Sequence, residues 1–214
     1  MFVANRMSKN PITISPDTTV VQAADIMKAH KINRLPVLDH GKLVGLVSDG
    51  DITRVSPSPA TTLSQYEISS LLDALKVREV MSKRVIAINA DATLEEAAYL
   101  MERNNISGLP VVDGSGAVVG VITARDILRA FINIMGLTDG KTRIALDVKD
   151  RVGAMEEISH ILAEDGVNID SLATYKEEAD RYEIVIRGDF PNLAESIKKL
   201  EEKGYKIAHT VEIR

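Results

Sequence analysis

The chain has 214 residues, of which 45% are hydrophobic and 27% charged, and its formal net charge is −5. These proportions are ordinary for a globular protein and exclude a chain that is disordered throughout. The length allows one large domain or two to three small ones. Because cysteine is absent, disulfides, thiolate nucleophiles and cysteine-based metal sites are excluded.

The composition also argues against several partners. No apolar run approaches the roughly 20 residues of a membrane span, and residues 1–6 do not begin a signal peptide, so we expect a cytoplasmic protein without a membrane partner. The four histidines lie far apart without metal-ligand spacing, and no metal site is predicted. Neither residues 1–140 nor residues 141–214 are basic overall, and aromatic residues are few, so nucleic acid is not an expected partner.

The first 130 residues are a tandem duplication. Between residues 7–39 and 81–113, fifteen of 33 positions are identical at an offset of 74. One extra residue in a turn then changes the offset to 75, which aligns Asp51 with Asp126. A single copy of ~50 residues would bury too little surface alone, so the two copies are expected to pack together.

Both copies have the pattern β-α-β-β-α. The first helix begins at a capping box, formed by Thr19 and Gln22 or by Thr93 and Glu96, and its apolar residues recur with helical spacing. A last helix begins near Asp51 or Asp126. The predicted strands are 12–14, 35–39 and 43–47 in the first copy, and 86–88, 109–113 and 118–122 in the second.

A different pattern occupies the last seventy residues. Apolar periodicity predicts the order β-α-β-β-α-β, which is a ferredoxin-like arrangement. The strands are expected at 144–148, 167–175, 182–186 and 205–213, and the helices at 155–164 and around Leu193, Ile197 and Leu200. The fold class predicted for the whole chain is therefore α/β (α+β).

The predicted domain boundaries follow from these patterns. The first copy covers residues 1–54 and the second 77–135, and the C-terminal domain covers 141–214. Between the copies, residues 55–76 form a linker whose first part contains two prolines and whose second part, 63–76, has the apolar spacing of a helix.

The repeated motifs resemble cystathionine-β-synthase (CBS) domains. The resemblance rests on Met-Ser-x-x-x-Ile-x-Ile, on Leu-Pro-Val-x-Asp, and on the endings Gly45-Leu-Val-Ser48-Asp-Gly-Asp51 and Gly120-Val-Ile-Thr123-Ala-Arg-Asp126, in the same order in both copies. It covers residues 3–132, and it implies a Bateman module, in which two CBS domains form composite clefts for adenosine-containing ligands.

The paired hydroxyl and carboxylate at each ending allow two interpretations. Ser48 or Thr123 ends a strand, and the Asp three residues later lies in the first helical turn, where amides and the helix dipole favour anions. A carboxylate there could accept both ribose hydroxyls. The same residue types are also preferred helix caps, and a purely structural role stays open.

The resemblance also implies which residues form each cleft. One site would combine Ser48 and Asp51 with Ile86, Ala87, Ser107, Gly108 and Pro110. The other would combine Thr123 and Asp126 with Ile12, Thr13, Asn33, Arg34 and Pro36, with Arg125 and Arg34 as candidate phosphate partners. The residue before the Asp is Arg125 in the second copy but Gly50 in the first, where the acidic Asp49 stands beside it. We therefore expect the Asp126 site to bind the nucleotide better than the Asp51 site.

The C-terminal domain resembles an ACT domain, a regulatory module that often binds amino acids. Asp150-Arg-Val-Gly153 and Gly166-Val-Asn168-Ile carry this resemblance, which covers residues 142–213. It implies an amino acid or another small metabolite at Asp150, Gly153 and Asn168. An ordinary turn with a dimer contact is the alternative, and Val152 departs from the proline that the family often has there.

Two CBS copies followed by an ACT domain resemble the acetoin-utilisation regulator family, which implies a link to acetoin or acetyl metabolism. Because no catalytic motif is found, we expect a non-enzymatic sensor that needs no cofactor. Its regulatory ligand would be AMP, ADP, ATP or S-adenosylmethionine. We expect a homodimer that acts on an unidentified protein; the alternative is a constitutive dimeric scaffold with vestigial clefts.

Overall fold

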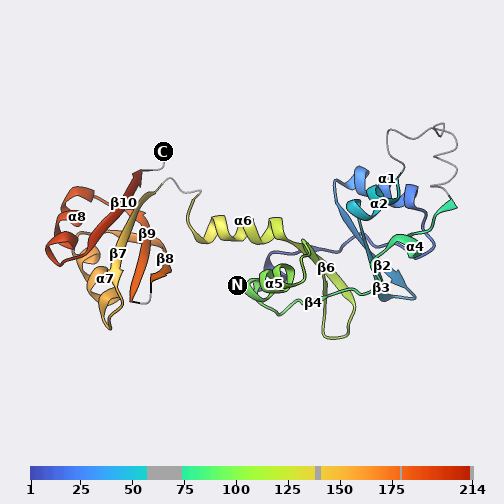
Figure 1. Ribbon diagram of the computed structural model, residues 1–214, viewed down its shortest axis with the longest axis horizontal. Helices are drawn as coiled ribbons and strands as arrows, with labels where there is room; N and C mark the ends of the chain where they lie inside the picture. The colour runs from blue at the N-terminus through green and yellow to red at the C-terminus, as the bar shows by residue number, and fades with distance from the viewer. Residues whose placement is uncertain (57–73, 138–140, 179, 213–214) are drawn as a thin grey trace. The chain divides into compact units, whose positions relative to one another are not determined.

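The computed structural model of the chain describes residues 1–56, 74–137, 141–178 and 180–212 (Figure 1). It divides into two units, Met1–Ile127 and Leu128–Arg214. Within the described residues, no helix is both long and apolar enough to cross a bilayer. In the same residues, no three His, Asp or Glu side chains gather as a metal site would require.

Both copies of the repeat lie in the first unit. The first copy consists of a 3-10 helix η1 (Val3–Asn5), β1 (Ser8–Lys9), α1 (Val20–His30), β2 (Arg34–Asp39), β3 (Lys42–Ser48) and α2 (Asp49–Val55). The second consists of α4 (Val77–Val80), β4 (Ile88–Asn89), α5 (Leu94–Arg103), β5 (Gly108–Val112), β6 (Val118–Thr123) and α6 (Ala124–Ile134), whose last residues belong to the second unit.

The predicted capping boxes are confirmed. Thr19 Oγ1 accepts from the Gln22 amide at 3.1 Å, and Gln22 Oε1 accepts from the Thr19 amide at 3.0 Å. Thr93 and Glu96 make the same reciprocal pair, at 3.2 and 2.7 Å. Each pair satisfies two helix amides that lack intrahelical partners, so α1 and α5 begin where the sequence predicts.

The strand predicted at residues 12–14 is wrong. Only Ile14 makes a bridge, to Val37, because Pro16 has no amide hydrogen to extend the pairing, whereas Ala90 at the equivalent position of the second copy donates to the Val112 carbonyl at 2.9 Å. In the second copy the strand is shorter and later than predicted, at Ile88–Asn89. The last helix of each copy begins two residues before the predicted Asp, at Asp49 and Ala124.

The segment that begins each copy pairs with a strand of the other copy. β1 pairs with β6, so that the N-terminal segment joins the sheet of the second copy, in the order β1-β6-β5-β4. Correspondingly, Ser82 exchanges backbone hydrogen bonds with Leu46 of β3, at 2.9 and 3.1 Å. The two copies are therefore interlocked along the backbone as well as packed.

Two glycines accommodate the exchanged segments. A β-carbon at Gly120 would overlap the side chain of Met7, and one at Gly45 would overlap that of Met81. The duplication relates Gly45 to Gly120 and Met7 to Met81, so the same close approach occurs twice. A larger residue at either glycine would have to displace the methionine side chain of the exchanged segment.

The helix predicted over 63–76 falls mostly on residues 57–73, which lie outside the described residues. The described end of the linker contacts the first copy, since the Leu75 carbonyl accepts from the Val20 amide at 3.0 Å.

The second unit has the predicted ferredoxin-like order. It contains β7 (Thr142–Lys149), α7 (Ala154–Glu164), β8 (Asn168–Glu178), β9 (Arg181–Asp189), α8 (Leu193–Glu202) and β10 (Lys206–Glu212). The strands form one antiparallel sheet in the order β10-β7-β9-β8. The mixed α/β fold class is therefore confirmed.

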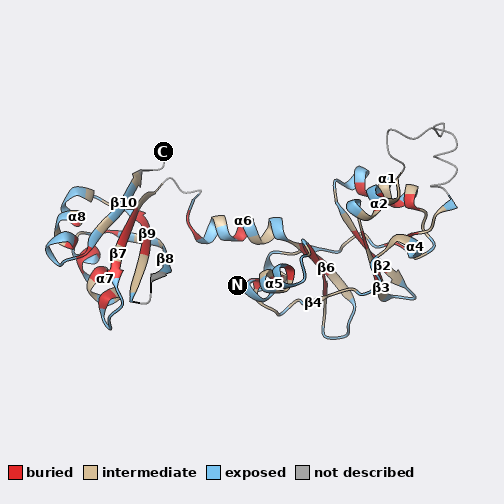
Figure 2. Cartoon of the chain, viewed as in Figure 1, coloured by how far each residue is buried: buried red, intermediate tan, exposed pale blue. Residues whose placement is uncertain are grey.

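Alternation along the strands places one face of this sheet against the helices. Ile144 and Leu146 of β7 and Ile184 and Ile186 of β9 share a buried cluster with residues of α7 and α8 (Figure 2). A second cluster, in the first copy, joins Val20 and Met27 of α1 to the strands β2 and β3. The first-copy core supports the elements that carry Arg34, Ser48 and Asp51, and the other core supports those of the C-terminal domain.

Candidate functional site

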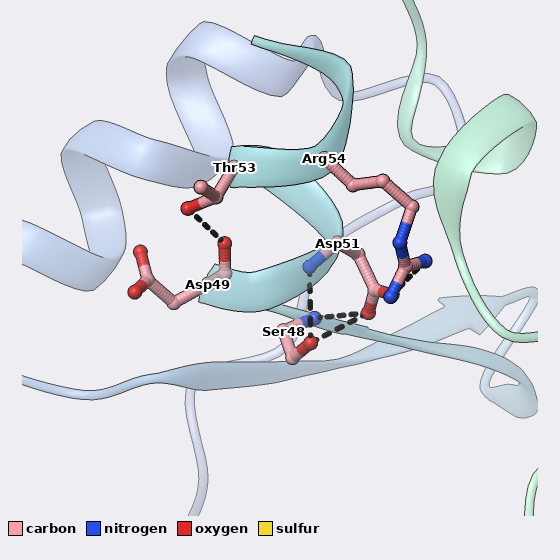
Figure 3. A network of polar contacts seen from close by, with 5 residues as sticks. All are labelled: Ser48, Asp49, Asp51, Thr53 and Arg54. Atoms are coloured by element: carbon pink, nitrogen blue, oxygen red, sulfur yellow. Dashed lines mark hydrogen bonds and ion pairs between the residues drawn. The ribbon is translucent and has the colours of Figure 1, made fainter.

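Ser48 and Asp51 form a reciprocal cap at the start of α2 (Figure 3). Asp51 Oδ2 accepts from the Ser48 amide at 2.9 Å and from Ser48 Oγ at 2.6 Å, while Ser48 Oγ accepts from the Asp51 amide at 3.3 Å. Thr123 and Asp126 repeat the same three contacts at 2.9, 2.6 and 3.3 Å. The capping role is therefore present in both copies, and it occupies one carboxylate oxygen of each Asp.

The other carboxylate oxygen differs between the copies. Asp51 Oδ1 accepts from Arg54 Nη1 at 3.1 Å, and the Arg54 side chain is 75% exposed (Figure 3). At the equivalent place in the second copy, Arg129 makes no ion pair with Asp126 within the described residues. A solvent-facing arginine can move aside, so capping leaves Oδ1 of either Asp able to accept from a ligand.

A cleft of about 330 Å³ lies beside Ser48 and Asp51, between the two copies. This volume falls at the lower end of the roughly 300–1,000 Å³ usual for small-molecule sites. Of the residues predicted for this site, Ser48, Asp51, Ile86, Ser107 and Gly108 line the cleft, whereas Ala87 and Pro110 do not. The sequence analysis missed seven of the lining residues: Leu46, Arg54, Ser82, Arg84, Val85, Asn105 and Ile106.

Guanidinium groups give the cleft its charge. Arg34, Arg54 and Arg84 all line it, together with the single carboxylate of Asp51. We expected the acidic Asp49 to weaken the binding of anions at this site. Its carboxylate points away from Asp51 in Figure 3. A cleft with three arginines and one acid suits an anionic ligand.

Arg34 lies between the two predicted sites. Its Nη1 donates to the Ser107 carbonyl at 2.5 Å and its Nη2 to Ser107 Oγ at 2.9 Å. Burial lowers the pKa of Arg34, while the nearby charge of Asp126 opposes that shift. Arg34 was assigned to the Asp126 site, but its side chain lines the Asp51 cleft and contacts the Asp126 side only electrostatically.

The other residues predicted for the Asp126 site are spread over several elements. Thr13, Asn33 and Arg125 are exposed, Ile12 is half-buried and Pro36 is buried in β2. The Asn33 carbonyl accepts from the Asp49 amide at 2.9 Å, so it supports the start of α2. None of these residues lines the Asp51 cleft, and their role in binding stays a prediction.

A wider hollow of about 620 Å³ lies on the helical side of the second copy. Its lining is largely apolar, with Met101, Ile106 and Ile127 among the residues. It contains no arginine and neither capping Asp. Although it is larger, it lacks the groups that would orient a nucleotide.

In the C-terminal domain, Gly153 begins α7 with φ of 87°, and the space where a β-carbon would stand is open. Asp150 is exposed, and its amide donates to the Asp180 carbonyl at 2.7 Å. Asn168 Nδ2 contacts Asp170 Oδ1 at 3.2 Å. The described residues show no hydrogen bond that joins Asp150 to Asn168, so a ligand role for these three residues stays a prediction.

Comparison with known proteins agrees with this architecture. The CBS domain profile matches residues 3–58 and 77–133, and the ACT domain profile matches residues 142–204. An L-aspartate semialdehyde sulfurtransferase of Methanocaldococcus jannaschii is 37% identical over 131 residues. That match covers 61% of this chain but spans only about a quarter (23%) of the enzyme.

Solved structures match the CBS pair. The CBS domain pair of protein MJ0100, in complex with 5′-methylthioadenosine and S-adenosyl-L-methionine, is 34% identical with a TM-score of 0.52, and the match covers 62% of this chain and 97% of that one. CBSX2 in complex with AMP is 28% identical (TM-score 0.51; 62% and 97% covered). A protein assigned to acetoin utilization (AcuB) from Vibrio cholerae is 31% identical (TM-score 0.52; 65% and 96% covered).

The interlocked repeats, their matched caps and the profile matches lead to one assignment. The chain belongs to the CBS-domain family, with two CBS domains followed by a C-terminal ACT domain.

Proposed function

We propose that this chain is a non-enzymatic regulatory protein that binds an adenosine nucleotide in the cleft beside Ser48 and Asp51. The observation that carries the proposal is the composite lining of that cleft. The first copy supplies Asp51, Arg34 and Arg54, and the second supplies Arg84, Ile86 and Ser107. A ligand bound there would touch both CBS domains, so its binding could bias their arrangement.

Each part of a nucleotide has a chemical counterpart in the cleft. Asp51 Oδ1, once released by Arg54, can accept from the ribose hydroxyls. Val85 and Ile86 offer an apolar wall for the base, and the arginines can donate to phosphate oxygens. Relatives support the ligand class, since the CBS pairs of MJ0100 and CBSX2 hold adenosine-containing ligands.

The charge of the cleft decides among the candidate ligands. Arg34, Arg54 and Arg84 favour the phosphates of AMP, ADP or ATP over the cationic sulfonium of S-adenosylmethionine. A second adenosyl site at Thr123 and Asp126, with Ile12, Thr13, Asn33, Arg34, Pro36 and Arg125, remains part of the proposal. It lacks the equivalent of Arg84, because Asn10 stands there.

The remaining roles are proposed at a coarser level. The ACT domain is proposed to take an amino acid or another small metabolite near Asp150, Gly153 and Asn168, and the protein to act as a homodimer in the cytoplasm. The likeness to AcuB of Vibrio cholerae supports a link to acetoin metabolism.

Thermal denaturation of the ligand-free chain with AMP, ADP, ATP and S-adenosylmethionine tests the proposal. A ligand at 100 times its dissociation constant adds about 2.7 kcal/mol. For a chain of this size that corresponds to a rise of roughly 5–11 °C. No rise with any of the four ligands, in protein shown to be folded and empty, would favour the scaffold alternative instead.

A further inference from the structure

Arg187 is a buried cation of the ACT domain, and two of its donors have no acceptor among the described residues. Arg187, on β9, is 5% exposed. Its Nε and Nη1 are enclosed by protein and make no hydrogen bond within the described residues. Arginine stays protonated in proteins, so this is a buried cation with these two donors unsatisfied. Burying such a group without an acceptor is costly, and native structures rarely leave it so.

The Arg187 side chain lies on the sheet face that points away from α7 and α8. Its neighbour Ile186 belongs to the core beneath the helices, and side chains alternate along a strand. Residues 135–136, which follow α6, lie against this outer face. Ser171 Oγ donates to the Met135 carbonyl at 3.1 Å, and a β-carbon on Gly136 would stand 3.6 Å from Arg187 Cδ. The cation is therefore covered by the chain itself.

Two acids on the same strand as Arg187, Glu183 and Asp189, already have partners. Arg143 lies opposite Arg187 in the β7–β9 register, and its Nη2 donates to Glu183 Oε1 at 3.2 Å. Asp189, two residues along β9, pairs with Lys141. Burial lowers the pKa of Arg187 and the charge of Arg143 lowers it further, while Tyr175 opposes the shift.

We propose that Arg187 anchors a binding site for a small oxyanion, a carboxylate or a phosphate, between β9 and residues 135–136. The site provides two enclosed donors of Arg187 and a second cation at Arg143, beside Ser171, whose hydroxyl ties residue 135 to the sheet. An oxyanion presents several acceptors to the planar guanidinium and neutralises its charge. The site differs in position and residues from the one expected at Asp150, Gly153 and Asn168.

The test is thermal denaturation of the full chain with sodium acetate or inorganic phosphate, against sodium chloride of equal ionic strength. The wild-type midpoint is expected to rise saturably with at least one anion, and the one that acts distinguishes carboxylate from phosphate. Arg187→Met is expected to bind at least about tenfold more weakly, because a charge-assisted hydrogen bond is lost. Without anion, Arg187→Met should be as stable as wild type or more so, since it removes an unpaired buried charge.

The matched control is Arg151→Met, which removes an arginine of the same domain that pairs with Glu157. It is expected to keep the anion response. Should Arg187→Met fail to fold, Arg187→Lys keeps the charge without the planar fork and is expected to weaken the response similarly. The proposal is overturned if the wild type shows no saturable response to either anion, or if the response survives in the Arg187 variants.

Discussion

The guanidinium of Arg34 occupies the space that a β-carbon on Gly108 would fill. These two residues hold equivalent positions in the duplicated sequence, since position 34 in the first copy aligns with 108 in the second. Because the two positions are in contact, there is no room for an arginine at both. The first copy has Arg34, and the second has Gly108, which has no side chain. The asymmetry lets Arg34 reach Ser107 and line the cleft beside Asp51.

Replacing Gly108 by Ala should therefore disturb the junction of the two CBS domains. The added methyl group overlaps the end of the Arg34 side chain, so Arg34 must move and give up its contacts with Ser107, at a cost of about 0.5–1.5 kcal/mol for each hydrogen bond. Chemical denaturation measures the loss. Gly114→Ala, in an exposed turn with open space around it, is the matched control and should change the free energy of unfolding little. Equal stabilities of the two variants would contradict this account of the junction.

Arg84→Gln should weaken nucleotide binding because a positive charge is lost, while the protein should fold as wild type does. Arg84 is exposed on the cleft wall, so its removal should reduce affinity for ATP by about tenfold, as expected for a lost charge-assisted hydrogen bond. The effect should be smaller for S-adenosylmethionine, which carries no phosphate. Lys83→Gln changes the neighbouring exposed cation, which does not line the cleft, and should bind as wild type does. Fluorescence titration compares the three proteins.

Asp165 should make the ACT domain sensitive to acid. Its side chain is 6% exposed, and the hydrogen bond from Lys199 holds its pKa below the ordinary value of 3.8. A carboxyl group with a lowered pKa in the folded state stabilises the protein fully above its unfolded pKa, and the contribution is lost as pH falls through the folded pKa. The free energy of unfolding should thus decline with falling pH, from about pH 5 downward.

The matching variant is Asp165→Asn, which should be less stable than wild type at neutral pH and show a shallower decline in acid. Glu201→Gln, at an exposed position of α8, should keep the wild-type pH dependence. Parallel acid profiles for wild type and Asp165→Asn would show that the Lys199 contact does not stabilise the fold.

Local patterns in the sequence were enough to predict most of the elements. The capping boxes at Thr19 and Thr93, and the ferredoxin-like order after residue 141, depend on neighbouring residues and on apolar periodicity, which a sequence displays directly. The strand predicted at 12–14 is wrong because apolar content does not show how far pairing extends, and Pro16 has no amide hydrogen to continue it.

The candidate site was predictable only in part. Ser48 and Asp51 form a contiguous motif, whereas Arg84 reaches the cleft through the exchange of segments between the copies. Arg34 and Ser107, which are 73 positions apart, are in contact, although the sequence analysis assigned them to different clefts. Likewise, no local pattern marks Arg187 as buried, because its cover comes from the residues that follow α6.

Calorimetric titration of the ligand-free chain with AMP tests the central claim most directly, using wild type, Asp51→Asn and Asp126→Asn. Asparagine retains an oxygen that can accept from the cap amide but loses the charge and the second acceptor oxygen, so folding and binding can be separated. We predict saturable binding by wild type that Asp51→Asn weakens by at least about tenfold and that persists at the Asp51 cleft in Asp126→Asn. Unchanged AMP binding in folded Asp51→Asn, or none in wild type, would contradict the account.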